Sequence, residues 1–295
     1  MNFVKMQGAG NDFIVIEAAV ATHDWSRLAV AMCDRHYGIG ADGLLLLAPS
    51  KIADFRMRIF NSDGSEAEAC GNGTRCVVRY FVDRNPGISH DREISVETMA
   101  GIRKARVHHT AKLTKVKVNM GKPGFGYKDI PVLLKSCDRV NARKPMITCT
   151  LQLDRRELSL ALVSMGNPHA VYFTDKSVAD FPLTRIGTKV EHHQIFPEGA
   201  NFEIARVVNR RQIEARVWER GAGETLACGT GACAIAVAAR LQGYVDDNVA
   251  VKLPGGTLEI EWAGNGDVFL SGPAETIFTG EWLEGNQKRQ IRENK

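Results

Sequence analysis

The chain has 295 residues, of which 44% are hydrophobic and 24% are charged, and its formal net charge is +4. This composition is typical of a globular protein that buries a core, and it excludes a disordered or fibrous chain. Since the length exceeds that of one compact domain, two domains are expected.

The charge and hydropathy patterns argue against two kinds of partner. Basic residues are scattered along the predicted elements, so nucleic-acid binding is not expected, and the basic group Lys288, Arg289 and Arg292 is interpreted as a solvated tail. The N-terminal segment does not resemble a signal peptide, and no apolar run approaches the roughly 20 residues that cross a bilayer. A cytoplasmic protein that does not associate with membranes is expected.

The seven cysteines form an odd set without a C-x-x-C pair. A disulfide framework and structural zinc are therefore both disfavoured, and the thiols are expected to be reduced. Burial as a small hydrophobic side chain is expected for Cys33, Cys137 and Cys149, and packing in a helix is favoured for Cys76 and Cys233.

The first motif along the chain is a glycine pattern at residues 38–43, Gly-Ile-Gly-Ala-Asp-Gly. It satisfies the dinucleotide-binding pattern G-x-G-x-x-G, which needs a strand before it and a helix after it. Here the apolar run 44–47 follows, which predicts a strand, so nicotinamide or flavin binding is not expected.

Short strands dominate the remaining pattern. Apolar and polar residues alternate over 55–60 and 213–217, and further strands are predicted over 103–108, 115–119, 157–163, 170–173 and 257–262. Helical patterns are few; two of them cover 77–82 and 234–241, and Gly243 suits the end of the second. An α+β fold with a mainly antiparallel sheet is predicted.

The chain contains a weak internal repeat. Residues 55–73, FRMRIFNSDGSEAEACGNG, match residues 213–231, IEARVWERGAGETLACGTG, and two shorter matches occur in the same order at nearly constant spacing, 10–11 with 166–167 and 40–42 with 199–201. We therefore expect two related halves: residues 1–120 with 273–295, carrying Cys70, and residues 121–272, carrying Cys228. The glycine- and proline-bearing stretch 121–126 marks the boundary between them.

Each half is expected to place its cysteine, Cys70 or Cys228, at a helix N-terminus. A helix N-terminus lowers the thiol pKa from about 8.5, and its unbonded N–H groups suit a carboxylate. Two such elements predict two thiols facing each other across a shared cleft, related by a pseudo-twofold axis. Inversion of an α-carbon needs a base on one face and an acid on the other, so a cofactor-independent amino-acid epimerase is predicted.

A set of motifs resembles a known family. KMQGAGNDF, GIGADG, RIFNSDGSEAEACGNGTRC, SMGNPHAV, GANF and ERGAGETLACGTGACA occur in the order found in diaminopimelate epimerases, over about residues 5–283. The resemblance implies interconversion of LL- and meso-diaminopimelate for lysine and peptidoglycan, without pyridoxal phosphate, another cofactor or a metal. It also implies two pseudo-symmetric halves, each a mainly antiparallel set of strands wrapped around a central helix, in a homodimer that binds a small amino acid.

The resemblance also implies a role for individual residues. Cys70 and Cys228 would be the acid–base pair. One group would hold the reacting end of the substrate: Gly71, Asn72, Gly229 and Thr230. A second group would bind the distal end, with charges and amides that suit its carboxylate and ammonium: Asn11, Asn61, Asn167, Asn201, Glu219 and Arg220. Gly43 departs from relatives that carry glutamine there, so one distal contact is missing.

Several alternatives stay open at this point. A racemase of histidine or a proline derivative would keep both thiols but lose Glu219 and Arg220. A binding protein without the chemistry would have replaced one cysteine, and a thiol–disulfide oxidoreductase is disfavoured by the distance between them along the chain. His169 is expected to be structural rather than catalytic, and the repeated Glu66 and Glu224 either orient loops or support the thiols.

Overall fold

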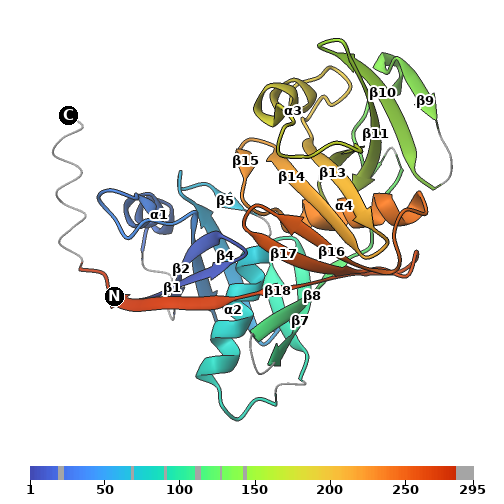
Figure 1. Ribbon diagram of the computed structural model, residues 1–295. Helices are drawn as coiled ribbons and strands as arrows, with labels where there is room; N and C mark the ends of the chain where they lie inside the picture. Colours follow the sequence, from blue (N-terminus) through green and yellow to red (C-terminus); the bar gives the residue numbers. More distant parts are fainter. Residues whose placement is uncertain are drawn as a thin grey trace, which may run out of the picture. The chain divides into compact units, whose positions relative to one another are not determined.

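The structure is a computed structural model that describes residues 1–18, 23–67, 70–89, 92–109, 114–126, 128–141 and 145–283 (Figure 1). It is a mixed α/β fold in which strands outnumber helices. The chain divides into two compact units, residues 1–118 with 272–295 and residues 119–271. The division expected from the sequence lies within two residues of this one. The basic tail at Lys288, Arg289 and Arg292 lies outside the described residues.

The first unit is a set of strands with two helices. Its strands are β1 (Asn2–Gly8), β2 (Asn11–Glu17), β3 (Gly43–Ala48), β4 (Phe55–Asn61), β5 (Glu66–Ala67), β6 (Ile94–Thr98), β7 (Gly101–His109), β8 (Thr114–Gly121) and β19 (Glu275–Glu281). They pair in the order β19–β1–β2–β3–β4–β6–β7–β8, with β5 added to β4, and only β2–β3 and β4–β6 are parallel among these pairs. The helix α2 (Gly71–Arg84) packs on six of these strands, and α1 (Trp25–Cys33) packs on β3 and β4.

The second unit contains the strands β9 (Arg139–Asn141), β10 (Ile147–Leu153), β11 (Arg156–Ser164), β12 (Pro168–Phe173), β13 (Asn201–Asn209), β14 (Gln212–Glu219), β15 (Gly223–Thr225), β16 (Asn248–Leu253), β17 (Gly256–Glu261) and β18 (Val268–Pro273). They pair in the order β9–β10–β11–β12–β13–β14–β16–β17–β18, with β15 added to β14, and β12–β13 and β14–β16 are parallel. Its helices are α3 (Leu183–Glu191), α4 (Gly229–Leu241) and the short 3-10 helix η1 (Leu134–Ser136).

The helix α4 is buried on all sides. Its sequence GTGACAIAVAARL is rich in alanine, the strongest helix former, and every residue from Gly231 to Ala239 is buried. A helix that is hydrophobic all round belongs inside a protein. The strands β11, β12, β13, β16 and β17 contact it, so the small side chains let the strands come close to the helix axis.

Each unit has its own hydrophobic core. In the first unit Leu44 and Phe60 pack with Met32 of α1, and in the second Phe202 packs with Ile186 of α3. Each such side chain contributes about 1.5–3 kcal/mol when it is fully buried.

The predicted elements agree with the observed ones. The strands expected at 55–60 and 213–217 are β4 and β14, and the strand expected after the glycine pattern is β3, which begins at Gly43. The expected helices are α2 and α4, and Gly243 follows the second with φ +77°. Because β3 takes the place where a dinucleotide-binding loop needs a helix, the pattern at 38–43 is not that fingerprint.

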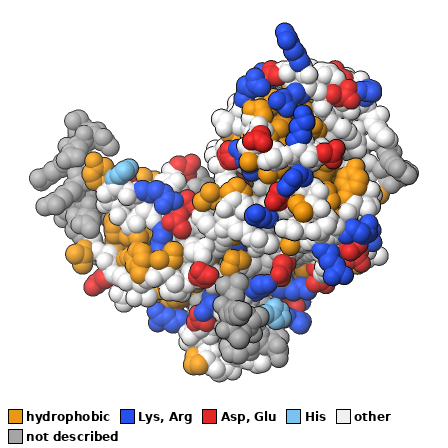
Figure 2. Space-filling model, viewed as in Figure 1, with side chains coloured by type: hydrophobic (Ala, Val, Ile, Leu, Met, Phe, Trp, Pro, Cys, Tyr) orange, Lys and Arg blue, Asp and Glu red, His pale blue; other side chains and the backbone are white. Residues whose placement is uncertain are grey.

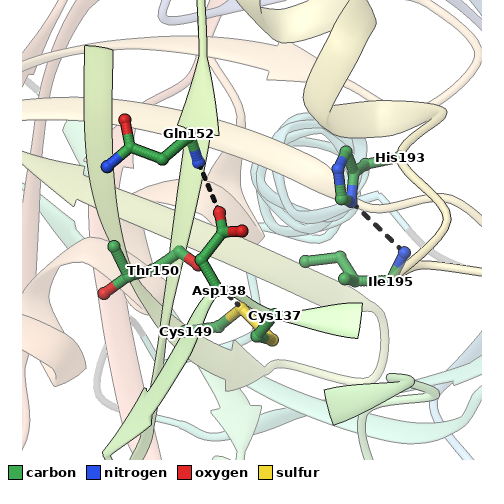
Figure 3. The surroundings of a disulfide bond; sticks show 7 residues. All are labelled: Cys137, Asp138, Cys149, Thr150, Gln152, His193 and Ile195. Atoms are coloured by element: carbon green, nitrogen blue, oxygen red, sulfur yellow. Dashed lines mark hydrogen bonds between the residues drawn. A yellow bond between two sulfur atoms is a disulfide. The ribbon is translucent and has the colours of Figure 1, made fainter. Parts of the chain in front are cut away.

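Cys137 and Cys149 form a disulfide, so the expectation of reduced thiols was wrong at these two positions (Figure 3). Cys149 lies in β10, Cys137 comes just before β9, and their Cα atoms are 5.9 Å apart. The antiparallel β9–β10 pairing brings them together, and the Asp138 N–H donates to the Thr150 carbonyl at 3.1 Å beside them. Cys149 is fully buried, as expected, but Cys137 is only partly buried.

The other expected structural cysteines are buried thiols. Cys33, Cys76 and Cys233 have at most 2% of their surface exposed. Burial raises the pKa of the Cys33 and Cys76 thiols to about 12, so both are neutral at physiological pH.

The surface carries charges of both signs. Figure 2 shows basic side chains interspersed with acidic ones over the face in view. Some form ion pairs within one unit, such as Arg79 with Asp83 at 2.6 Å and Arg206 with Glu214 at 2.6 Å. Among the described residues, no helix has the length and apolar character needed to span a membrane.

Candidate functional site

Cys70 is the N-cap residue of α2. Its backbone is extended, with φ −146° and ψ 115°, and its Sγ accepts a hydrogen bond from the Gly73 N–H at 3.3 Å. The Thr74 N–H bonds the Cys70 carbonyl at 2.8 Å, which closes the first helical turn. The sulfur thus occupies the place that a serine or aspartate oxygen usually takes at a helix start, and the prediction of its position is confirmed.

Cys228 has the same geometry in the second unit. It is the N-cap of α4, with φ −117° and ψ 117°, and its Sγ accepts from the Gly231 N–H at 3.4 Å. The Thr230 hydroxyl lies 3.5 Å from the same sulfur. Cys228 is 4% exposed, whereas Cys70 is partly exposed.

The charge state expected of a thiol at a helix start is wrong for Cys228. Burial raises the pKa of this thiol well above its usual value, and the carboxylates of Glu219 and Glu203 raise it further. The Thr230 hydroxyl and the Gly231 N–H lower the pKa, but by less. Cys228 is therefore a neutral thiol at neutral pH, because the helix terminus does not outweigh burial next to two carboxyl groups.

Asn11 and Asn72 lie beside Cys70. Asn72 donates from Nδ2 to Asn11 Oδ1 at 3.2 Å, and that same oxygen is 4.0 Å from Cys70 Sγ. Asn11 in turn donates from Nδ2 to Asp42 Oδ2 at 2.5 Å. The structure thus places Asn11, which was expected at the distal end of the substrate, beside Cys70 and Asn72 at the start of α2, and it adds Asp42, which was not expected from the sequence. The repeat of residues 40–42 at 199–201 was the signal that could have identified it.

An ion-pair network supports Asp42. Lys5, which is 5% exposed, pairs with Asp12 at 2.6 Å and donates to the Gly40 carbonyl. Arg35 pairs with Asp12 at 2.9 Å and with Asp42 at 2.7 Å. Burial acts to raise the pKa of Asp12, but the hydrogen bonds from Arg35 and Lys5 prevail and lower it to about 2. The network fixes the start of β2 against the loop that precedes β3.

Asn61 and Gly43 lie opposite each other on β4 and β3. Asn61 is exposed, and its Nδ2 donates to Ser65 Oγ at 2.9 Å. A Cβ atom at Gly43 would lie 2.9 Å from the backbone oxygen of Phe60, closer than Cβ contacts in proteins come. A side chain at position 43 would therefore require the backbone here to shift.

Asn201 and Arg220 are joined in the second unit. Asn201 is 3% exposed, donates from Nδ2 to the Pro168 carbonyl at 2.9 Å, and accepts from the Arg220 N–H at 2.9 Å. The Arg220 guanidinium is exposed and donates to the Glu198 carbonyl at 3.0 Å. Asn201 thus fixes the turn that presents this guanidinium.

Glu219 precedes that turn and lies near Cys228. Its Oε1 accepts from the Thr225 hydroxyl at 2.5 Å, and its charge acts on the Cys228 thiol. The carboxylate expected at the distal end of the substrate therefore also lies within electrostatic reach of a catalytic candidate.

His169 and Glu203 form a buried pair. His169 has no exposed surface; its Nδ1 lies 2.6 Å from Glu203 Oε1 and its Nε2 lies 2.9 Å from Asn167 Oδ1. Both ring nitrogens are bonded, as expected of a structural histidine. Glu203 was not expected from the sequence, since a single glutamate in an apolar strand has no distinguishing pattern.

The repeated glutamates brace the loops that lead to the cysteines. Glu66 makes two bonds with Arg58, at 2.6 and 2.8 Å, and Glu224 makes two with Arg216, at 2.8 and 3.0 Å. Each pair joins neighbouring strands, β4 with β5 and β14 with β15. Of the two roles left open, the structure supports loop orientation.

Comparison of the sequence with known proteins gives a family match. A family model described as "Diaminopimelate epimerase" matches residues 3–126 and 161–277. The diaminopimelate epimerase of Acetivibrio thermocellus is 48% identical, over 95% of this chain and 98% of that protein. The diaminopimelate epimerases of Heliobacterium modesticaldum and Methanococcus maripaludis are 46% and 43% identical, each over 95% of this chain and 99% of the relative.

Structural comparisons give the same fold at low identity. A PhzF-family phenazine biosynthesis protein from Bacillus anthracis has a TM-score of 0.67 at 16% identity, covering 96% of this chain and 99% of that one. A probable proline racemase from Agrobacterium radiobacter, with bound carbonate, has a TM-score of 0.68 at 15% identity, covering 96% and 93%. At these identities the likeness shows the fold alone.

Proposed function

The chain belongs to the diaminopimelate epimerase family and is an isomerase that epimerises diaminopimelate, and we propose that it does so by exchanging the α-proton between the thiols of Cys70 and Cys228. The reaction is the interconversion of the LL and meso isomers. The observation that carries this mechanism is that each unit places one cysteine as the N-cap of a helix, with a backbone N–H bonded to its sulfur.

The proton transfer needs one thiolate and one thiol. The thiolate removes the α-proton, the electron pair stays on the α-carbon and spreads into the carboxylate, and the thiol delivers its proton to the opposite face. Cys228 is the acid in the first step, because its raised pKa keeps it protonated. Cys70 is the base, and after one turnover the two sulfurs have exchanged protonation states.

The neighbours of Cys228 stabilise its thiolate after the proton transfer. Once it has given up its proton, its sulfur carries a negative charge in a buried site near Glu219. The Thr230 hydroxyl and the Gly231 N–H are the groups that stabilise this charge, at 3.5 and 3.4 Å. A substrate carboxylate held at the helix start would be stabilised by the same kind of N–H group while the carbanion forms.

The two units are related halves, and this relation suits the reaction. In support, both units have the same succession of strand pairs: β2–β3 and β4–β6 are parallel, as are β12–β13 and β14–β16, and β5 and β15 each fold back on the preceding strand. In both, the cysteine helix follows that short strand. Two similar half-sites suit two α-carbon configurations that are mirror images.

The substrate contacts form two groups, one for each end of the substrate. The first turns of α2 and α4 hold the reacting carboxylate and amine, through Gly71, Asn72, Gly229 and Thr230. The distal end is bound by a second set: Asn11, Asn61, Asn167, Asn201, Glu219 and Arg220. Support comes from the Arg220 guanidinium, which is exposed on a turn fixed by Asn201 and so is available to a carboxylate.

The oligomeric state, the cellular location and the absence of a cofactor are part of the same proposal. The family resemblance implies a homodimer in the cytoplasm that needs no cofactor or metal. Sedimentation of the purified protein tests the dimer, and activity after exhaustive chelation tests the requirement for metal.

Incubation in deuterium oxide tests the function. The reduced, chelator-treated protein is given LL-diaminopimelate without a cofactor, and isomer composition and α-deuterium are followed. The expected result is the meso isomer with deuterium at the inverted carbon. Inversion of proline or histidine, with no reaction of diaminopimelate, would refute the assigned substrate but keep the thiol chemistry.

A further inference from the structure

Glu203 is a fully buried carboxyl group next to the Cys228 helix. It lies in β13, and a Cβ atom added at Gly231 in the first turn of α4 would come within 3.1 Å of its Oε1. That oxygen is 2.6 Å from His169 Nδ1, while Oε2 is buried with no hydrogen-bond partner among the described residues. The proton transfer described above does not use this carboxyl group.

The number of protons on the pair follows from burial. An isolated negative charge without solvent is costly, so Glu203 and His169 hold one proton between them and carry no net charge. Burial raises the pKa of Glu203, which also favours a pair that holds one proton. The charge of Glu219 also raises the pKa of Glu203, so a second negative charge is disfavoured here.

Either position of the shared proton leaves a hydrogen on Nε2, the other nitrogen of the His169 ring. If the proton is on Glu203, it points at Nδ1, so the neutral ring has its hydrogen on Nε2. If the proton is on Nδ1, the ring is an imidazolium and Nε2 again carries a hydrogen. In both states Nε2 donates to the Asn167 amide, so the atom that lies 2.9 Å from Nε2 is the acceptor Oδ1.

We infer that Glu203 is a positioning residue: through His169 it fixes the Asn167 amide with Oδ1 on the ring and Nδ2 available to donate to a substrate carboxylate. The inference rests on the proposed function, in which Asn167 contacts the substrate. Without Glu203, Nδ1 of the His169 ring has no group with which to share a proton. The Asn167 amide can then turn and present its oxygen, an acceptor, to the substrate instead of Nδ2.

The corresponding asparagine of the first unit is held with the opposite polarity. Asn11 donates from Nδ2 to Asp42 at 2.5 Å, so its Oδ1 is the atom next to Cys70 and Asn72. An acceptor suits an ammonium group and a donor suits a carboxylate. The two amides thus distinguish the two charged groups of an amino acid, and Asp42 and Glu203 set their directions.

Nitrogen NMR of the imidazole rings tests the positioning without any turnover. The chain has eight histidines, and the signal that disappears in His169→Gln is assigned to His169. We expect its Nε2 to carry a hydrogen in the native protein at neutral pH. A lone pair on Nε2 in the native protein would overturn the inference, whether or not the protein epimerises diaminopimelate.

Two variants test whether the state of the His169 ring affects substrate binding. Glu203→Gln can still donate to Nδ1, so it should keep the Nε2 hydrogen and a KM within about threefold of the native value. Glu203→Leu cannot, so its ring nitrogen signals should differ from those of the native protein. Its KM should rise about tenfold or more, the loss expected for a hydrogen bond to a charged group, with a smaller change in kcat. An unchanged KM in Glu203→Leu with an altered ring signal would refute the link to substrate. If the leucine variant does not fold, the native and glutamine spectra still decide the protonation of Nε2.

Discussion

Replacing Thr230 with valine should make the Cys228 thiol harder to ionise. The hydroxyl lies 3.5 Å from Sγ and is one of two groups that lower the pKa of this thiol against burial and two carboxylates. A hydrogen bond to a charged group contributes about 1.5–3 kcal/mol, and one pKa unit corresponds to about 1.4 kcal/mol. For a sulfur acceptor we expect a contribution at the lower end of this range. In Thr230→Val the pKa of the Cys228 thiol should therefore rise by about one unit, and its thiolate fraction should fall about tenfold.

Alkylation by iodoacetamide measures that fraction without substrate. The rate at the Cys228 peptide is followed by mass spectrometry from pH 7 to pH 10, and the Cys70 peptide of the same digest is the internal reference. Thr230→Val should react about tenfold more slowly at Cys228 than the native protein, and Thr230→Ser, which keeps the hydroxyl, should react like it. Equal rates for valine and threonine at every pH would refute the assigned hydrogen bond.

Three further predictions concern stability. Replacing both Cys137 and Cys149 with serine should cost about 3 kcal/mol, the loop-closure contribution for cysteines 12 residues apart, and the native protein should contain five titratable thiols rather than seven before reduction. Gly187→Ala should cost about 1–3 kcal/mol and shift tryptophan fluorescence, because the new Cβ would lie 2.5 Å from Trp218; an unaltered urea midpoint would contradict this. Asp12→Asn should cost about 2 kcal/mol at pH 7, since the pKa of Asp12 is lowered from 3.8 to about 2. That contribution is complete above about pH 4 and is lost as the pH falls through 2, so the difference in unfolding free energy should be smaller at pH 3 than at pH 7.

Much of the fold follows from periodicity and repetition. The alternation in residues 55–60 and 213–217 predicted β4 and β14, and the glycines after each cysteine predicted the helix starts. These features are local, since two successive strand residues point to opposite faces and a helix start needs only its first turn. The motifs around Cys70 and Cys228 were sufficient to identify the family.

The features that the sequence did not reveal depend on tertiary contacts. Pairing of Cys137 with Cys149 requires the β9–β10 register, which the spacing of two cysteines does not specify. The raised pKa of Cys228 comes from burial near two carboxyl groups, so an argument from the helix terminus alone gave the wrong direction. Glu203 meets His169 only because β12 and β13 are paired in parallel.

The variants Cys70→Ala and Cys228→Ala test the two-base mechanism most directly. Each is purified, its fold is compared with the native protein by circular dichroism, and the conversion of LL- to meso-diaminopimelate is measured under reducing conditions. The mechanism predicts that both variants fold and that each loses at least about a hundredfold in rate, the smallest contribution expected of an acid or base in proton transfer. Either folded variant with native turnover would contradict it.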